Sequence, residues 1–287
     1  TTSDNGDGTV TITDYDKACG TEVNIPETIK GKTVTKIGNK AFPAKGITSL
    51  TLPDTLKVIS SEAFTDNKLK ELEIPASVTE IGAYAFRYML ISKLTLHEGL
   101  KYIGLDAFQN NYISEISIPS TVTYIGGGAF AANSVTGDKA FIYGRNSDGS
   151  TDYTKLSSYA GKDATGTTIP DTVTTIMQEA YYLVRYEEID IPSKIKDIPG
   201  LCFNNSHATK ITLHEGLEKI YNGAFGGPDM QSIDIPSTIT YISDTAFSCS
   251  WNGCSNHPTL KTININKSAN SIAGAPWGSN ATVNWLK

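Results

Sequence analysis

Two identical four-residue segments are the first feature of this sequence that could carry chemistry. Each reads His-Glu-Gly-Leu, and together they occupy residues 97–100 and 214–217. A histidine beside a glutamate is a combination found in metal sites and in acid–base catalysts. Both histidines, however, stand where equivalent segments of the chain have a proline, and they lie far apart in the sequence. We therefore interpret both segments as turns. The other histidines, His207 and His257, have no partner at a ligand-like spacing.

Two glycine-rich segments partly resemble ligand-binding loops. Residues 4–8, Asp-Asn-Gly-Asp-Gly, begin like a calcium loop but lack its later ligands and its bidentate glutamate. Residues 126–128 are three glycines, but the Lys-Ser or Lys-Thr of a phosphate-binding loop does not follow them. We interpret the first segment as a turn and the second as part of a repeated unit. We therefore expect no catalytic residues, no metal site and no cofactor.

The four cysteines are too sparse for a disulfide framework in a chain of 287 residues. Cys202 stands where equivalent segments have alanine, so we expect a buried free thiol there. Cys249 and Cys254 share one insertion, and a disulfide between them stays open because it would require export. Cys19 has no obvious partner.

The composition narrows the classes of partner. The formal net charge is −6 and the isoelectric point is near 5.3, so no basic surplus is available to neutralise phosphates. No apolar stretch approaches the ~20 residues that cross a bilayer. We therefore expect neither nucleic-acid binding nor membrane insertion. Residues 1–9 lack the charged and apolar parts of a signal peptide, so we expect any such peptide to have been removed or to lie outside this sequence.

An internal repeat organises nearly the whole chain. Apolar residues recur every 22 residues in four columns, first up to residue 130 and again from residue 169. The first column is aliphatic, with Leu52, Ile74, Leu96, Ile118, Ile169, Ile191, Leu213 and Ile235. The fourth column is aromatic, with Phe42, Phe64, Phe86, Phe108, Phe130, Tyr181, Phe203, Phe225 and Phe247. Such columns predict stacked coils, each of which adds the same side chains to one continuous core.

Each coil has two recognisable halves. In residues 70–75 polar and apolar residues alternate up to Pro75, which predicts a short strand with Leu72 and Ile74 pointing inward and a turn at the proline. In residues 81–86 small residues precede Phe86, and we interpret this half as a helical turn. The chain is thus predicted to be an α/β repeat solenoid. It should be right-handed, with parallel strands on the concave face and short helical turns on the convex face.

Departures from the period divide this solenoid, which we expect to be a single domain of residues 1–287. Residues 141–143 are predicted to supply a strand, whereas residues 156–160 imitate the helical half of a coil. The expected parts are an N-terminal cap at 1–22, regular repeats at 23–135, irregular coils with a loop insertion at 136–168, regular repeats at 169–247, an insertion at 248–262, and the last coil with a C-terminal cap at 263–287.

The repeated segments resemble the BspA-like, or Treponema pallidum type, leucine-rich repeats. The clearest examples are Ile-Pro-Ser-Thr-Val-Thr-Tyr-Ile-Gly-Gly-Gly-Ala-Phe at 118–130 and Ile-Pro-Ser-Thr-Ile-Thr-Tyr-Ile-Ser-Asp-Thr-Ala-Phe at 235–247, and residues 23–38 resemble the usual first coil. The resemblance extends from about residue 10 to residue 285. It implies a right-handed leucine-rich repeat in a bacterial cell-surface or secreted protein, often from host-associated bacteria, that adheres to host or matrix proteins. It transfers no catalytic residues and no fixed ligand contacts.

A row of small or acidic side chains on the predicted strands is the first candidate binding surface. Each residue of this row precedes the last inward residue of its strand, and a spacing of one strand could suit a protein or a glycan. A sheet face kept polar for solubility is the alternative, and the sequence leaves both open. The row consists of Thr51, Glu73, Thr95, Ser117, Asp190, Thr212 and Asp234.

Aromatic residues outside the core columns are the second candidate. Tyr102 and Tyr124 occupy one position on successive coils, where rungs about 5 Å apart allow their rings to stack, and Tyr241 occupies it later. Arg87-Tyr88 adds another aromatic, and Trp251 is the best candidate for an exposed anchor in the second insertion. Rigid exposed aromatic residues are favoured in recognition surfaces, although packing between rungs is the simpler explanation of the tyrosine pair.

These observations predict a non-catalytic binding module on a bacterial surface or secreted from the cell, which we expect to be an extracellular monomer. Its partner would be a host or matrix protein or a glycan, reached by adhesion. One alternative is a structural spacer that projects another domain. The other is a glycan- or peptide-acting enzyme, which would need two carboxylates about 5–10 Å apart in a pocket, or a nucleophile with its base. Ligand, binding face, oligomeric state, organism and anchoring mechanism stay open.

Overall fold

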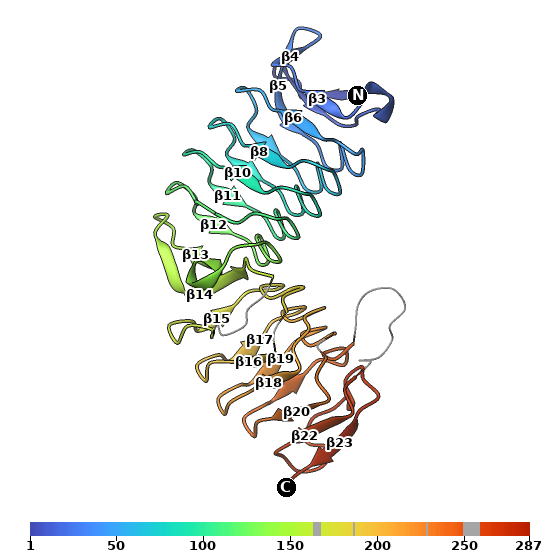
Figure 1. Cartoon of the computed structure of the whole chain (residues 1–287), viewed down its shortest axis with the longest axis vertical. Coiled ribbons are helices and arrows are strands. Elements are labelled where there is room, and N and C mark those ends of the chain that lie inside the picture. Colours follow the sequence, from blue (N-terminus) through green and yellow to red (C-terminus); the bar gives the residue numbers. More distant parts are fainter. Residues whose placement is uncertain (163–167, 186, 228, 249–258) are drawn as a thin grey trace. The chain divides into compact units, whose positions relative to one another are not determined.

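The structure is a computed structural model that describes residues 1–162, 168–185, 187–227, 229–248 and 259–287. The chain forms two compact units, unit 1 from Thr1–Val135 with Gly144–Asp152, and unit 2 from Thr136–Tyr143 with Tyr153–Lys287. Each unit is a β-solenoid whose short strands stack like steps (Figure 1). In the described part of the chain the helices are two short 3-10 turns, η1 (Lys17–Cys19) and η2 (Gly137–Ala140). No helix there has the length and hydropathy needed to cross a membrane.

One parallel ladder runs along unit 1. It begins with β1 (Thr2–Asp4), which lies antiparallel to β2 (Thr9–Ile12) and so covers the edge of the ladder, as a cap should. The next strands continue in parallel, and one isoleucine of each is in register with the next. They are β5 (Lys32–Ile37), β7 (Val58–Ile59), β9 (Glu80–Ile81), β11 (Tyr102–Ile103) and β12 (Tyr124–Ile125), and β4 (Thr28–Ile29) pairs with β5.

A second set of strands forms the side of unit 1 that carries the predicted row. The solvent-exposed side chains of these strands are called the outer face. The strands are β3 (Glu22–Asn24), β6 (Ser49–Thr51), β8 (Glu71–Glu73) and β10 (Lys93–Thr95), paired in parallel as β3 with β6 and β8 with β10. Pro53 and Pro75 follow β6 and β8 within two residues. Because proline lacks a backbone N–H, it suits the turn that ends each strand.

The predicted helical turns are wrong: the third side of the coils, which we call the turn side, is not helical. Every second backbone N–H group there donates to a carbonyl of the next coil, as from Phe64 to Ala85 at 2.9 Å and from Phe86 to Ala107 at 2.8 Å. In an α-helix these groups would bond to carbonyls four residues earlier in the same segment. A run of about six residues offers little to offset the cost of helix nucleation, whereas the next coil presents aligned acceptors. Residues 156–160 are not helical either, because they lie in and just after a strand, β14 (Thr151–Tyr159).

The repeated Ile-Gly pair of unit 1 has a steric cause. A Cβ atom built on Gly82, Gly104 or Gly126 would lie 2.6, 2.5 or 2.4 Å from a backbone nitrogen of the preceding coil. Real Cβ atoms essentially never come so close to backbone atoms. These glycines therefore set the close approach of neighbouring coils at this corner.

The predicted apolar columns fill the interior. In unit 1 Phe42, Phe64, Phe86, Phe108 and Phe130 are at most 1% exposed, and neighbouring rings stack with centroids 4.8–5.5 Å apart. In unit 2 Tyr159, Tyr181, Phe203, Phe225 and Phe247 stack in the same way at 5.3–5.8 Å. The aliphatic first column is less complete, because Leu96, Ile118 and Leu213 are only half-buried.

Unit 2 repeats the arrangement with more irregular spacing. The chain passes between the units in β13 (Phe141–Arg145), as expected for a strand at 141–143, and in β14. β14 pairs in parallel with β15 (Thr175–Ile176). The other strands of unit 2 are also parallel to their partners. They form the sets β16 (Glu188–Asp190) and β18 (Lys210–Thr212); β17 (Asp197–Ile198), β19 (Lys219–Ile220) and β21 (Tyr241–Ile242); and β20 (Ser232–Ile235), β22 (Thr262–Ile265) and β23 (Thr282–Trp285).

Candidate ligand-binding surfaces

The outward side chains of β6, β8 and β10 border a groove of about 580 Å³ in unit 1. Of the predicted row, Glu73 and Thr95 line the groove, whereas Thr51 is exposed at the end of β6 beside it. β8 and β10 are in register, so Glu73 and Thr95 are direct neighbours. The row therefore lies where the sequence places it on these three strands, and the strands bring two of its members together in one concave site.

The floor and rim of this groove carry both signs of charge. Lys68, Lys70 and Lys93 line it together with Glu71 and Glu73. Lys93 Nζ lies 3.7 Å from a carboxylate oxygen of Glu71, and both side chains are more than 70% exposed. Exposed pairs of this kind contribute little to stability, so a ligand can compete for either charge at small cost to the fold.

Ser117 does not extend the strands of the outer face as the predicted row requires. Ser117 is exposed, but residues 112–119 contain no strand, so the expected rung at this coil is missing from the outer face. Trp251 lies outside the described residues, and so do Cys249 and Cys254. The groove on the outer face of unit 1 is bordered by β6, β8 and β10 alone among the described strands.

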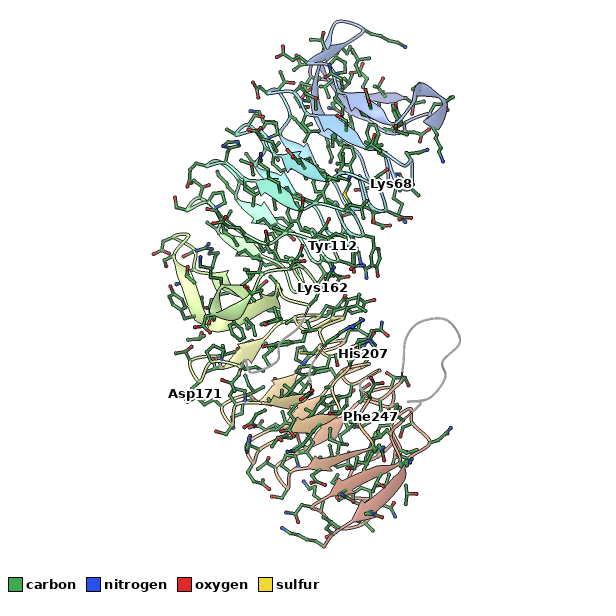
Figure 2. The ribbon with its side chains drawn as sticks, in the orientation of Figure 1. Lys68, Tyr112, Lys162, Asp171, His207 and Phe247 are labelled. Atoms are coloured by element: carbon green, nitrogen blue, oxygen red, sulfur yellow. The ribbon has the colours of Figure 1, made fainter. Side chains whose placement is uncertain are left out.

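In unit 2 the row is split between two places. Asp190 of β16 and Thr212 of β18 are in register, and Asp190 borders a hollow of about 400 Å³ with Asp171 and His214. Asp171 lies at the edge of the ribbon opposite His207 (Figure 2). Asp234 of β20 is part of a different arrangement, described next.

Asp234 begins a ladder of side-chain hydrogen bonds along β20, β22 and β23. Asn264 donates through Nδ2 to Asp234 Oδ1 at 2.8 Å, and Asn284 donates to Asn264 Oδ1 at 2.9 Å. Neither asparagine belongs to the predicted row, because the spacing between these strands departs from 22 residues. Their position in alternating strand segments, Thr-Ile-Asn-Ile and Thr-Val-Asn-Trp, was the available signal.

The two histidines of the His-Glu-Gly-Leu segments contact this same row. His97 Nε2 lies 2.9 Å from a carboxylate oxygen of Glu73, and His214 Nε2 lies 2.5 Å from one of Asp190. Each pair joins an outward carboxylate to the turn of the next coil, and the histidine side chains are about 40% exposed. Within the described ranges, no group of three or more His, Cys, Asp and Glu side chains could hold a metal ion.

The glutamates of these segments fasten one turn to the next. Glu98 accepts hydrogen bonds from the backbone N–H groups of Ser120 at 3.0 Å and Thr121 at 3.1 Å, and Glu215 accepts one from Ser237 at 2.9 Å. These hydrogen bonds lower the pKa of both carboxyls, while desolvation opposes the shift. The largest contribution comes from the backbone N–H of Ser120 for Glu98 and from that of Ser237 for Glu215. Each segment lies at a turn, so the turn interpretation is correct and the glutamates have a structural role.

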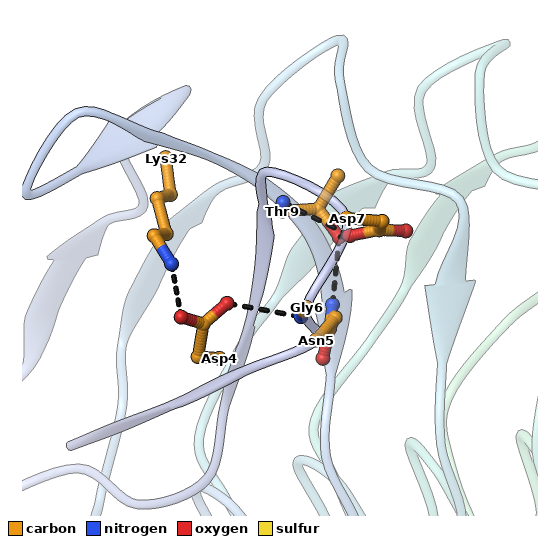
Figure 3. Close-up of polar contacts among 6 residues, drawn as sticks. All are labelled: Asp4, Asn5, Gly6, Asp7, Thr9 and Lys32. Atoms are coloured by element: carbon orange, nitrogen blue, oxygen red, sulfur yellow. Dashed lines mark hydrogen bonds and ion pairs between the residues drawn. The ribbon is translucent and has the colours of Figure 1, made fainter.

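The glycine-rich loop at residues 4–8 is also a turn (Figure 3). Asp4 accepts from the N–H of Gly6 at 3.0 Å and pairs through its other oxygen with Lys32. Asp7 accepts from the N–H and the hydroxyl of Thr9 at 3.0 and 2.6 Å. In each case an aspartate side chain accepts from the backbone N–H two residues later, as in an Asx turn, which agrees with the interpretation of this segment as a turn.

The tyrosine pair stacks as expected. The rings of Tyr102 and Tyr124 lie 4.6 Å apart at an interplanar angle of 5°, on β11 and β12, and the residues are 39% and 40% exposed. Desolvation, then the neighbouring Tyr124 and Glu80, raises the pKa of the Tyr102 hydroxyl. In unit 2 Tyr241 contacts Tyr221 at 5.8 Å in a tilted arrangement. Because the tyrosine rings cover each other, the pair presents ring edges, and it serves packing between rungs at least in part.

The two cysteines that the structure describes are both free thiols. Cys202 is buried, as predicted from its place in the alanine position, and burial raises the pKa of its thiol. Cys19 is exposed in η1.

A ladder of buried asparagines, which the repeat pattern did not predict, lies on the turn side. Asn111 Oδ1 accepts from the N–H of Ile91 at 3.1 Å, and its Nδ2 donates to the carbonyls of Phe86 at 2.9 Å and Phe108 at 3.0 Å. Asn67 and Asn133 make equivalent bonds on their own coils. A Phe-x-x-Asn spacing at three coils was the signal that could have found them.

The repeat pattern and this core are shared with a known group of proteins. The profile of the BspA type Leucine rich repeat region matches residues 15–137 and 154–275, in six copies. The chain belongs to this family. A search of curated proteins found no relative of this BspA-type chain.

Two solved structures resemble the BspA-type chain in fold. The pneumococcal vaccine antigen PcpA is 19% identical with a TM-score of 0.62, over 94% of this chain and 80% of the antigen. A leucine rich cell surface protein from Faecalibacterium prausnitzii is 21% identical with a TM-score of 0.60, over 100% of this chain and 93% of that protein. At these identities the likeness establishes a shared fold.

Proposed function

We propose that this chain is a non-catalytic binding module of a bacterial cell-surface or secreted protein, and that it adheres to a host or matrix protein or to a glycan. The carrying observation is the groove on the outer face of unit 1. Its residues come from successive parallel strands, so their positions are fixed by the backbone ladders rather than by a loop. Such a rigid, concave, polar surface loses little entropy on binding.

The family and the related structures support a location at the bacterial cell surface or outside the cell. Of the two structures that share the fold, one is named a vaccine antigen and the other a cell surface protein. A surface-exposed binding module is consistent with both names. The groove also offers hydrogen-bonding and charged groups of both signs, which suits polar ligands such as glycans and peptide segments.

The test fills the groove with side chains. Thr51→Arg with Thr95→Arg would project two guanidinium groups over the outer face, and Thr35→Arg, a half-exposed position on β5 of the other ladder, is the matched control. Each variant is assayed against a glycan array and against purified fibronectin, laminin, fibrinogen and serum albumin. We expect any probe that binds the parent chain to bind the control variant equally well and to lose its binding to the double variant.

Two results would count against the proposal. A parent chain that binds no probe would support the structural spacer instead. Binding that survives the filled groove would show that the outer face is not the contact surface.

A further inference from the structure

An arginine held between two tyrosines lies on the turn side of unit 1, apart from the strands of the outer face. The guanidinium carbon of Arg87 lies 4.4 Å from the ring centroid of Tyr88 and 5.2 Å from that of Tyr84. Arg87 Nη2 donates to the Tyr88 hydroxyl at 2.9 Å, and Nε donates to Gln109 Oε1 at 2.7 Å. The cluster is therefore rigid before any partner arrives.

Both tyrosines occupy backbone positions that disfavour large side chains. Tyr84 has φ +60° and Tyr88 has φ +55°, in the left-handed region. A bulky residue there costs on the order of 1 kcal/mol or more relative to glycine. Other coils place Gly128 at the position of Tyr84, and Asn110 or Ala132 at that of Tyr88. The fold of the coil thus does not require tyrosine at either position, and its presence indicates another use.

Two exposed apolar residues extend this cluster along the same corner of successive coils. Leu90 is 40% exposed and Tyr112 is 51% exposed. The Tyr112 N–H donates to the carbonyl of Ile91 at 2.8 Å, which places Tyr112 beside Leu90 on the next coil. Figure 2 shows Tyr112 and Lys68 along one edge of unit 1.

The corresponding corner of unit 2 is polar. Leu90 and Tyr112 each lie four residues after a core phenylalanine, and so do His207 and Asp229 in unit 2. His207 Nδ1 lies 3.0 Å from a carboxylate oxygen of Asp229, and both side chains are at least half-exposed. A hydrophilic pair is therefore compatible with this coil position, so the apolar pair of unit 1 is specific to its site.

Three cationic side chains lie near the apolar residues. Lys68 and Lys70, which also line the groove of the outer face, are exposed on the coil before Leu90, and neither forms an ion pair within the described part of the chain. Arg87 adds a third cation, and the exposed carboxylate of Asp66 on the neighbouring coil is the opposing negative charge. In a chain with a net charge of −6 this corner is locally basic, which complements an acidic surface.

We infer that Tyr84, Arg87, Tyr88, Leu90 and Tyr112, here called the aromatic patch, dock a protein whose interface carries an apolar side chain among carboxylates. This inference rests on the proposed function and adds a surface and a partner class to it. None of the five residues lines either hollow described above, and small saccharides favour concave sites. Tyrosine and arginine are enriched among the residues that dominate protein–protein binding energy.

The experiment compares matched pairs of variants in the full chain. Leu90→Ser with Tyr112→Ser removes the apolar side chains, and His207→Ser with Asp229→Ser makes the same change at the equivalent corner of unit 2. Affinities for fibronectin, laminin, fibrinogen and serum albumin are measured by biolayer interferometry at low and high salt, beside the glycan array. We expect binding of at least one of these proteins to weaken about tenfold or more with the first pair, to stay unchanged with the second, and to weaken with salt.

A further variant separates binding from folding. Tyr88→Gly relieves the left-handed strain, so the thermal midpoint should stay or rise while protein binding falls. Equal loss with both serine pairs, loss of binding that follows loss of stability, or no binding to any of the four proteins would overturn the inference. Glycan binding without protein binding would overturn it while leaving the proposed function intact, whereas no binding to any probe would overturn both.

Discussion

The substitution Asn111→Leu tests whether the asparagine ladder holds the turn side together. Asn111 is fully buried, and leucine has a similar shape without the amide. Loss of the amide leaves one backbone N–H and two carbonyls without this partner, those of Ile91, Phe86 and Phe108. Each buried polar group left unpaired costs about 1–2 kcal/mol. The three groups together cost about 3–6 kcal/mol, and the added apolar burial of leucine returns about 1–2 kcal/mol, so the net loss should be about 1–5 kcal/mol.

Urea unfolding followed by far-UV circular dichroism measures this loss. Repeat proteins can unfold in segments, so hydrogen exchange at the Ile91 amide provides a local reading of the same bond. Met89→Leu is the matched control, because Met89 occupies the equivalent place on the preceding coil and is 2% exposed. It should cost less than about 1.5 kcal/mol, as volume-conserving apolar changes do. If Asn111→Leu costs no more than the control and exchange at Ile91 is unchanged, the ladder does not stabilise the coil.

Three further substitutions address the corners and turns of unit 1. Gly104→Ala places a Cβ 2.5 Å from a backbone nitrogen of the preceding coil and should destabilise by about 1–3 kcal/mol in the same urea assay, whereas Ser60→Ala, at the corresponding position of another coil, should change little. Glu98→Gln should reduce the loss of thermal stability at acid pH. Folding lowers the pKa of the Glu98 carboxyl, so this carboxylate stabilises the fold above its ordinary pKa of 4.5, and the stabilisation is lost as the pH falls below that value. A thermal midpoint that falls with pH as steeply in the variant as in the parent chain would contradict this. Asp66 has φ +58°, so Asp66→Gly should leave the free energy of unfolding unchanged or raise it by up to about 1 kcal/mol. Thr65 lies outside the left-handed region, so Thr65→Gly should lower that free energy. Equal losses in the two variants would show that the strain at residue 66 is unimportant.

The coil explains why these positions differ so strongly within a few residues. Each coil bonds to its neighbours along three sides, through two sets of parallel strands and through the turn side. Small changes in the separation of the coils therefore act on every bond along the affected side. Side chains that face solvent on the same coils take no part in these backbone bonds, so the residue type can vary there without loss of the fold. The groove and the aromatic patch both use such positions.

Much of the core could be predicted from the sequence because its cause is local and repeated. The 22-residue columns name the buried phenylalanines directly, and the prolines mark the ends of β6 and β8. Glu73 and Asp190 were placed on the outward side of their strands by alternation alone. Period-two alternation before a proline is sufficient for such assignments, since every second side chain of a strand points to the same face.

The features that the sequence could not supply depend on bonds between coils. The turn side was predicted as helical because small residues before a phenylalanine also suit a helix, yet every second N–H group there bonds to a carbonyl of the next coil. The asparagine ladder, the carboxylate of Glu98 on the next turn, and the missing strand around Ser117 arise from the same cross-coil geometry. The sequence by itself thus determined which side chains are buried and which strands recur, because hydrophobic periodicity is a property of the chain. Only the tertiary structure decided where backbone hydrogen bonds go and which outward residues meet in a groove, because both depend on how far apart the coils stack.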